Sequence, residues 1–136
     1  EKTMISVSKG IPLLPLRTVM DLGQERKLGV MPGALGSGDT YGIKVLSLFP
    51  ENPSKGLSSH IGLMLLFDPK TGMPTAAINA DALTAVRTAA ATAVATKHLA
   101  IKDTISMTII GSGEQAEFHI KSIPLVRPIK NINVVI

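Results

Sequence analysis

The sequence predicts an α/β fold, because a sheet-rich first part, one long helix and a strand–helix–strand unit follow one another along the chain. Up to about residue 80, short apolar runs alternate with Pro, Gly, Asn and Asp, which is typical of strands joined by turns. The pattern then takes a helical period before a last pair of strands. We therefore expect two incomplete domains, residues 1–100 and residues 101–136.

The composition favours a folded protein without nucleic-acid or membrane partners. Of 136 residues, 45% are hydrophobic and 18% are charged, which excludes a disordered chain. The net charge is +4, but Lys and Arg are scattered and aromatics make up only 3%, so bases would find few stacking partners. No apolar run approaches the ~20 residues of a membrane span. The lack of cysteine and of a signal-peptide pattern leads us to expect a cytoplasmic protein.

Five extended segments make up the sheet-rich part. The loop "DPKTG" between the last two carries Asp-Pro and Gly turn signals, so we expect those two to pair as a hairpin. "GSGD" predicts another turn, and "ENPSKG" predicts a loop. The resulting sheet is antiparallel or mixed. In chain order, the expected strands are 13–22, 29–35, 41–49, 60–67 and 74–80.

The segment 82–100 is dense in Ala, the best helix former, and predicts a long helix. Its threonines lower the helix propensity somewhat. Thr84 or Asp81 is expected to cap the start of the helix. Lys97 and His98 suit its carbonyl end, where the macrodipole is negative.

Three basic residues stand out from their surroundings. Arg87 falls in the first turn of the expected helix, where the macrodipole disfavours a cation, so it is an anion receptor or a surface arginine paired with an acid such as Asp81. Strand alternation places Lys44 on one face with Leu46, so Lys44 lies at a sheet edge or reaches into a pocket. Arg17, in another extended segment, presents the same choice.

A strand at 104–110, the turn "GSGEQA", a helix and a strand at 131–136 form the last unit. Such units are almost always right-handed with parallel strands. Gly111 permits a tight turn, Gly113 lets a pyrophosphate approach the backbone, and Ala116 allows close packing of helix and strand. The helix start also offers N–H groups to an anion. The alternative is a glycine turn in an α/β protein that binds no nucleotide.

The three histidines lack the spacing of metal ligands, and no acidic residues complete a cluster with them, so we expect no metal site. His98 and His119 are expected to be structural or exposed. His60 stands where a loop meets a strand, a place where functional residues concentrate, and its role stays open.

Taken together, the strings "GIKVLSLFPENPSKGLSSH", "LLFDPKTGMPTAAI", "LTAVRTAAATAVATKHLA" and "IIGSGEQAEFH" resemble the ornithine cyclodeaminase/mu-crystallin family in order and spacing. The resemblance extends from about Arg17 to Ile136. It implies a homodimer whose first domain, residues 1–100, builds the dimer interface and the substrate pocket. It also implies that residues 101–136 begin a Rossmann domain, which holds NAD or NADP.

The resemblance assigns roles to individual residues. Arg17, Lys44 and Arg87 would surround the carboxylate of the substrate, and Lys44 would also donate a proton to an imine or stabilise its charge. Ser59, His60 and Arg87 would lie near the nicotinamide and the phosphates. The dinucleotide turn would consist of Gly111, Gly113, Glu114, Gln115 and Ala116.

The implied function is hydride transfer at the nitrogen-bearing carbon of a small amino or cyclic imino acid. The enzyme would resemble an ornithine cyclodeaminase, or a ketimine or pyrroline-2-carboxylate reductase. The alternative is a non-catalytic, mu-crystallin-like protein that binds NADPH and a small ligand. The family's later Rossmann segment, with its catalytic aspartate and ribose-reading residue, and its N-terminal helical region are expected to be missing. We therefore expect a truncated chain that is inactive alone.

Overall fold

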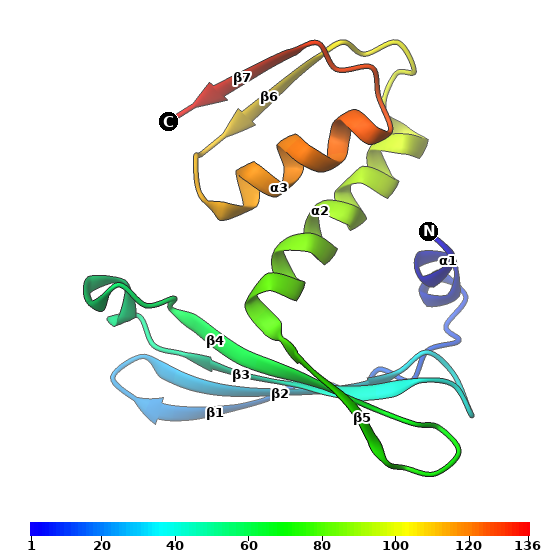
Figure 1. Ribbon diagram of the computed structural model, residues 1–136, viewed down its shortest axis with the longest axis vertical. Coiled ribbons are helices and arrows are strands. Elements are labelled where there is room, and N and C mark those ends of the chain that lie inside the picture. Colours follow the sequence, from blue (N-terminus) through cyan, green and yellow to red (C-terminus); the bar gives the residue numbers. More distant parts are fainter. The chain divides into compact units, whose positions relative to one another are not determined.

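The computed structural model describes all residues, 1–136, and Figure 1 traces them in chain order. The chain divides into two compact units. Residues 2–83 form the first unit, and residues 84–136 together with Glu1 form the second. The division falls inside the long helix α2.

The first unit is a five-stranded antiparallel sheet with the strand order β1-β2-β3-β4-β5. All five predicted strands are present, but the first begins at Thr18 and not at residue 13, and the second begins three residues before its predicted start. Of the two predicted sheet types the antiparallel one is formed. The hairpin around "DPKTG" is also confirmed, with Leu65 opposite Ala77. The "ENPSKG" loop contains a short 3-10 helix, η1 (Asn52–Lys55). The strands are β1 (Thr18–Gly23), β2 (Arg26–Ala34), β3 (Tyr41–Leu48), β4 (His60–Phe67) and β5 (Pro74–Asn79).

A short helix, α1 (Lys2–Ser8), precedes the sheet, at the end of the chain where an N-terminal helical region was expected to be missing. Its residues include neither Gly nor Pro, so nothing in the segment interrupts a helical backbone. The chain leaves the helix at Gly10, whose φ of +67° is a conformation that glycine adopts without strain.

The long helix, α2 (Ala80–Leu99), begins two residues before the predicted start. Its cap is neither Thr84 nor Asp81. The side-chain oxygen of Asn79 accepts hydrogen bonds from the backbone N–H groups of Asp81 (2.9 Å) and Ala82 (3.0 Å). This is the usual function of an N-cap asparagine, which satisfies N–H groups that have no partner within the helix.

The second unit contains a strand–helix–strand arrangement, as predicted. The strands β6 (Ser106–Ile110) and β7 (Asn131–Val135) pair in parallel, with Ser106 opposite Asn131. Between them lie α3 (Glu114–Ser122) and a short 3-10 helix, η2 (Ile123–Leu125). No helix of the chain is both long enough and apolar enough to cross a membrane.

Arg127 closes the carbonyl end of α2. It is buried, with 8% of its surface exposed. Its guanidinium donates to the carbonyl oxygens of Lys97 and Ala100, each at 2.8 Å, and of Ile101 at 3.1 Å. A fourth bond reaches the carbonyl of Val126. The last carbonyls of a helix lack partners within it, so Arg127 supplies the missing donors.

Candidate active site

The turn between β6 and α3 contains two glycines in different conformations. Gly111 has φ +101°, which L side chains rarely adopt, and its N–H donates to the carbonyl of Val135 at 2.7 Å. Gly113 is the N-cap of α3, with φ −74° and ψ 179°, an extended conformation open to any residue. A Cβ atom added at Gly113 would meet no heavy atom within 4 Å. Neither the backbone nor the packing of this chain therefore requires glycine at position 113.

The start of α3 presents backbone donors. The N–H of Ala116 bonds to the carbonyl of Gly113 at 2.9 Å, whereas the N–H groups of Gly113, Glu114 and Gln115 have no partner in the chain. No side chain caps this end of the helix. Free N–H groups and the positive end of the helix dipole form a site that suits an anion.

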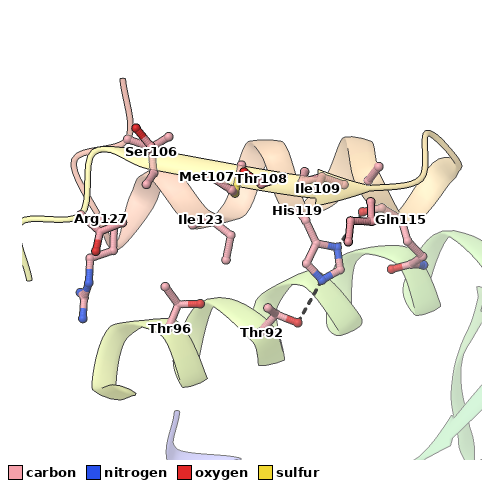
Figure 2. A pocket seen from close by; sticks show the side chains of 14 residues that line it. Thr92, Thr96, Ser106, Met107, Thr108, Ile109, Gln115, His119, Ile123 and Arg127 are labelled. Carbon is pink, nitrogen blue, oxygen red and sulfur yellow. Dashed lines mark hydrogen bonds between the residues drawn. The ribbon is translucent and has the colours of Figure 1, made fainter. Parts of the chain in front are cut away.

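A cavity of about 480 Å³ lies between β6, α3 and α2, as Figure 2 shows. His119 of α3 reaches across it to Thr92 of α2, with Nε2 2.9 Å from the threonine hydroxyl. Gln115 also lines the cavity, and its side-chain oxygen is buried without a hydrogen-bond partner. Polar groups thus occupy the space next to the glycine turn. No three His, Asp or Glu side chains lie close enough together to hold a metal ion.

Lys44 occupies the middle strand of the five-stranded sheet. It is half-buried and pairs with Met31 on β2 and with Met64 on β4. The interpretation of Lys44 as an edge residue is therefore wrong, because β3 has a neighbour on each side. On the Lys44 face, a cavity of about 420 Å³ lies between the sheet and α1, and Met31 and Met64 line it.

Ser59 and His60 lie at the start of β4, and the Ser59 hydroxyl is 2.9 Å from His60 Nδ1. Side chains alternate along a strand, so His60 shares a face with Met64 and therefore with Lys44. Arg17 is exposed and directly precedes β1. The first unit thus carries Lys44 and His60 on one face of its sheet.

Arg87 is the eighth residue of α2, counting from Ala80, and so does not lie in the first helical turn. The helix dipole therefore does not disfavour Arg87 as predicted, because Asn79, and not Thr84, caps the helix. Arg87 is exposed and forms neither the expected pair with Asp81 nor another ion pair. Its guanidinium is accessible to an anion.

Comparison with known proteins identifies the family. The sequence profile of the ornithine cyclodeaminase/mu-crystallin family matches residues 2–135. The chain belongs to this family. The Δ1-pyrroline-2-carboxylate reductase of Bacillus cereus is 35% identical over 121 residues, which are 88% of this chain and 37% of the reductase. The chain therefore spans little more than a third of that relative's length.

Solved structures of related proteins agree. The Thermococcus litoralis Δ1-pyrroline-2-carboxylate reductase, in complex with NADH and L-proline, superposes with a TM-score of 0.87 and 39% identity, covering 98% of this chain and 42% of the reductase. An archaeal alanine dehydrogenase dimer with bound NAD gives a TM-score of 0.88 and 31% identity, covering 98% of this chain and 41% of the dehydrogenase. Both of these structures thus hold a nicotinamide dinucleotide.

Sequence reasoning missed three residues around the site. Asn79 caps α2, Arg127 closes its other end, and His119 joins α3 to α2. Local signals existed for two of them: Asn79 directly precedes the helical segment, where Asn is a preferred N-cap, and His119 lies four residues after Gln115, close enough along a helix to bond its carbonyl. The partners of Arg127 are up to 30 residues away, so no local pattern indicates them.

Proposed function

We propose that this chain is part of an NAD(P)-dependent enzyme of amino-acid metabolism. Its substrate is a small amino or cyclic imino acid, as in ketimine and pyrroline-2-carboxylate reductases or in cyclodeaminases. Bound NAD or NADP would transfer hydride at the nitrogen-bearing carbon. The single observation that carries the proposal is Gly113, because the fold itself leaves the space above this glycine empty.

The dinucleotide site is formed by the turn and the first residues of α3. The parallel pair β6 and β7, with α3 between them, serves as the first βαβ unit of a Rossmann domain. The free N–H groups at the start of α3 bind the pyrophosphate, and the missing side chain at Gly113 lets it approach. The full set of residues is Gly111, Gly113, Glu114, Gln115 and Ala116.

The substrate pocket lies on the Lys44 face of the sheet in residues 1–100. Lys44, Arg17 and Arg87 bind the carboxylate, because a buried carboxylate needs charged hydrogen-bond partners. The register of β1 and β2 supports the role of Arg17: Thr18 pairs with Val30, so one further step sets Arg17 opposite Met31, which pairs with Lys44. Lys44 also protonates the imine or stabilises its charge. Ser59 and His60 contact the nicotinamide region.

The enzyme is a homodimer that uses the opposite face of the sheet. Met20, Ile61 and Leu63 share that face and are 56%, 45% and 52% exposed. Large apolar side chains gathered on one side of a sheet are costly to leave in water. A related archaeal alanine dehydrogenase is a dimer, which supports the same assembly.

The decisive experiment is Gly113→Ala in the intact protein. The added methyl group meets no protein atom, so the melting temperature stays close to that of the original protein. The affinity for NADH or NADPH, measured by fluorescence quenching, falls by at least about tenfold, because the methyl group occupies the space of the pyrophosphate. Lys121→Ala, at the other end of α3, is the matched control and keeps the original affinity.

Unchanged dinucleotide affinity in Gly113→Ala would refute the assignment of the turn. Turnover is tested separately with Δ1-pyrroline-2-carboxylate, a cyclic ketimine and ornithine. An intact protein that binds the cofactor but turns over none of these would instead be a binding protein.

A further inference from the structure

His119 bonds to both helices of the second unit through its two ring nitrogens. Nδ1 lies 2.6 Å from the carbonyl oxygen of Gln115, in the first turn of α3. Nε2 lies 2.9 Å from the hydroxyl of Thr92, in α2, as the dashed line in Figure 2 shows. A carbonyl oxygen only accepts hydrogen bonds, so Nδ1 carries a proton. In the neutral ring, Nε2 then accepts the single hydroxyl proton of Thr92, which lies closer to Nε2 (2.9 Å) than to its other acceptor, the carbonyl of Thr88 (3.2 Å).

Thr92 belongs to a row of threonines along α2. Thr84, Thr88, Thr92 and Thr96 recur every four residues and so lie along one side of the helix. The Thr88 hydroxyl bonds back to the carbonyl of Thr84 at 2.7 Å, and the Thr92 hydroxyl lies 3.2 Å from the carbonyl of Thr88. Thr92 is the member of the row that bonds to α3, while Thr96 lines the same cavity without a side-chain hydrogen bond.

These two helices carry two of the proposed anion sites. The dinucleotide turn directly precedes α3, and His119 bonds to the carbonyl of Gln115 at the start of that helix. Arg87, proposed to bind the substrate carboxylate, lies five residues before Thr92 on α2. The bond between His119 and Thr92 therefore joins the helix of the cofactor site to the helix of a substrate ligand.

We propose that His119 is a positioning residue: through Thr92 it fixes the dinucleotide turn relative to Arg87, and so sets the geometry of hydride transfer. The inference rests on the proposed function. The bond does not form the turn itself, so its loss leaves cofactor binding largely intact. The loss of the bond displaces the bound cofactor relative to the substrate, and small displacements of reacting atoms lower the reaction rate strongly.

The test uses the intact protein with NADH and the cyclic imino acid that it reduces. His119→Asn keeps a donor near the position of Nδ1 but does not reach Thr92, and Thr92→Val removes the hydroxyl. We expect kcat per bound NADH to fall by on the order of tenfold in each variant, with less than about a threefold change in the Kd for NADH. The double variant is no slower than either single variant, because both remove the same bond.

Two conservative variants and one control separate positioning from general stability. His119→Gln places an amide near the position of Nε2, and Thr92→Ser retains the hydroxyl, so both restore kcat. Thr96→Val changes the same cavity without breaking a bond and leaves kcat unchanged. If the contact only supports the fold, His119→Asn and Thr92→Val lower the melting temperature and the amount of NADH bound, but leave kcat per bound NADH unaltered.

Unaltered kcat per bound NADH in His119→Asn and Thr92→Val would overturn the inference while leaving the proposed function in place. A protein that binds neither NADH nor NADPH would instead overturn the proposed function, and the inference with it. If His119→Asn does not fold, kcat per bound NADH in Thr92→Val and Thr92→Ser decides between the two roles. Val keeps the β-branched shape of threonine but lacks the hydroxyl, whereas Ser keeps the hydroxyl that bonds to His119.

Discussion

Replacing Arg127 with Met removes a charged cap while keeping an unbranched apolar stem. Arg127 uses four of its five N–H donors: one bond ends on the carbonyl of Lys97 in the last turn of α2, and two end on Ala100 and Ile101, which directly follow the helix. No carboxylate pairs with the guanidinium, and the negative end of the helix dipole balances part of its charge. The substitution therefore leaves three carbonyls without these donors, one in the last turn of α2 and two directly after it.

The size of the effect follows from these bonds. A hydrogen bond from a charged donor contributes about 1.5–3 kcal/mol, but the three are not additive, and water satisfies part of what is lost. We expect a loss of about 2–4 kcal/mol in the local stability of the α2 end. That corresponds to roughly 30- to 700-fold faster opening, at tenfold for each 1.4 kcal/mol.

Amide hydrogen exchange of the intact protein measures this opening directly. In Arg127→Met, the amides of the last turn of α2 and those of Lys130 and Asn131, which bond to the carbonyl of Ile105, should exchange faster by that factor. Arg127→Lys keeps the charge but not the planar fork, so its effect is intermediate. Lys130→Met serves as the neighbouring control. Exchange in Arg127→Met at the original rate would refute the reasoning.

Three further predictions concern the first unit and Arg87. Lys44→Ala and Arg87→Ala should each lower kcat/KM of the intact enzyme by about 10- to 100-fold, whereas the control Lys27→Ala leaves it unchanged. Normal kinetics in Lys44→Ala or in Arg87→Ala would contradict the assignment of that residue to the substrate pocket. Gly62→Ala should cost about 3 kcal/mol or more in unfolding experiments, because its Cβ would overlap the carbonyl oxygen of Val45. Hydrogen bonds from Thr71 and Lys70 hold the pKa of Asp68 below its ordinary value. The ionised carboxylate therefore stabilises the β4–β5 turn fully above the ordinary aspartate pKa, and this stabilisation is lost as the pH falls through the lowered pKa of Asp68. The Thr71 amide signal in NMR spectra should titrate with Asp68, and an acid titration of that signal that persisted in Asp68→Asn would exclude Asp68 as the titrating group.

The elements of the fold could be predicted because their signals are local. The hairpin at "DPKTG" follows from turn chemistry, and Asp68 accepts the turn hydrogen bonds that its position suggests. The start of α2 was misjudged by two residues because Ala80 continues an apolar, strand-like run, whereas the Asn79 side chain already caps the helix. Only a cap at Thr84 would have placed Arg87 in the first turn, and Asn79, five residues earlier, is the cap instead, so the dipole argument for Arg87 fails.

Strand order could not be predicted in the same way. Alternation correctly groups Lys44 with Leu46 and Leu48 on one face, but whether β3 is an edge or a central strand depends on pairing with residues far along the chain. The same holds for Arg127, whose carbonyl partners come from another element. Sequence patterns thus identify which residues are unusual, and tertiary pairing decides what surrounds them.

The two glycines of "GSGEQA" show how the structure divides a motif between folding and function. Gly111 has a positive φ, so the backbone alone explains its identity, and any protein with this turn would favour glycine there. Gly113 has an ordinary φ and open space around it, so neither strain nor packing explains the missing side chain. The motif predicts this division, with Gly111 for the tight turn and Gly113 for the approach of a pyrophosphate. Only the second therefore points to a molecule outside the chain, and substitution at Gly113 tests for that ligand without disturbing the turn that would hold it.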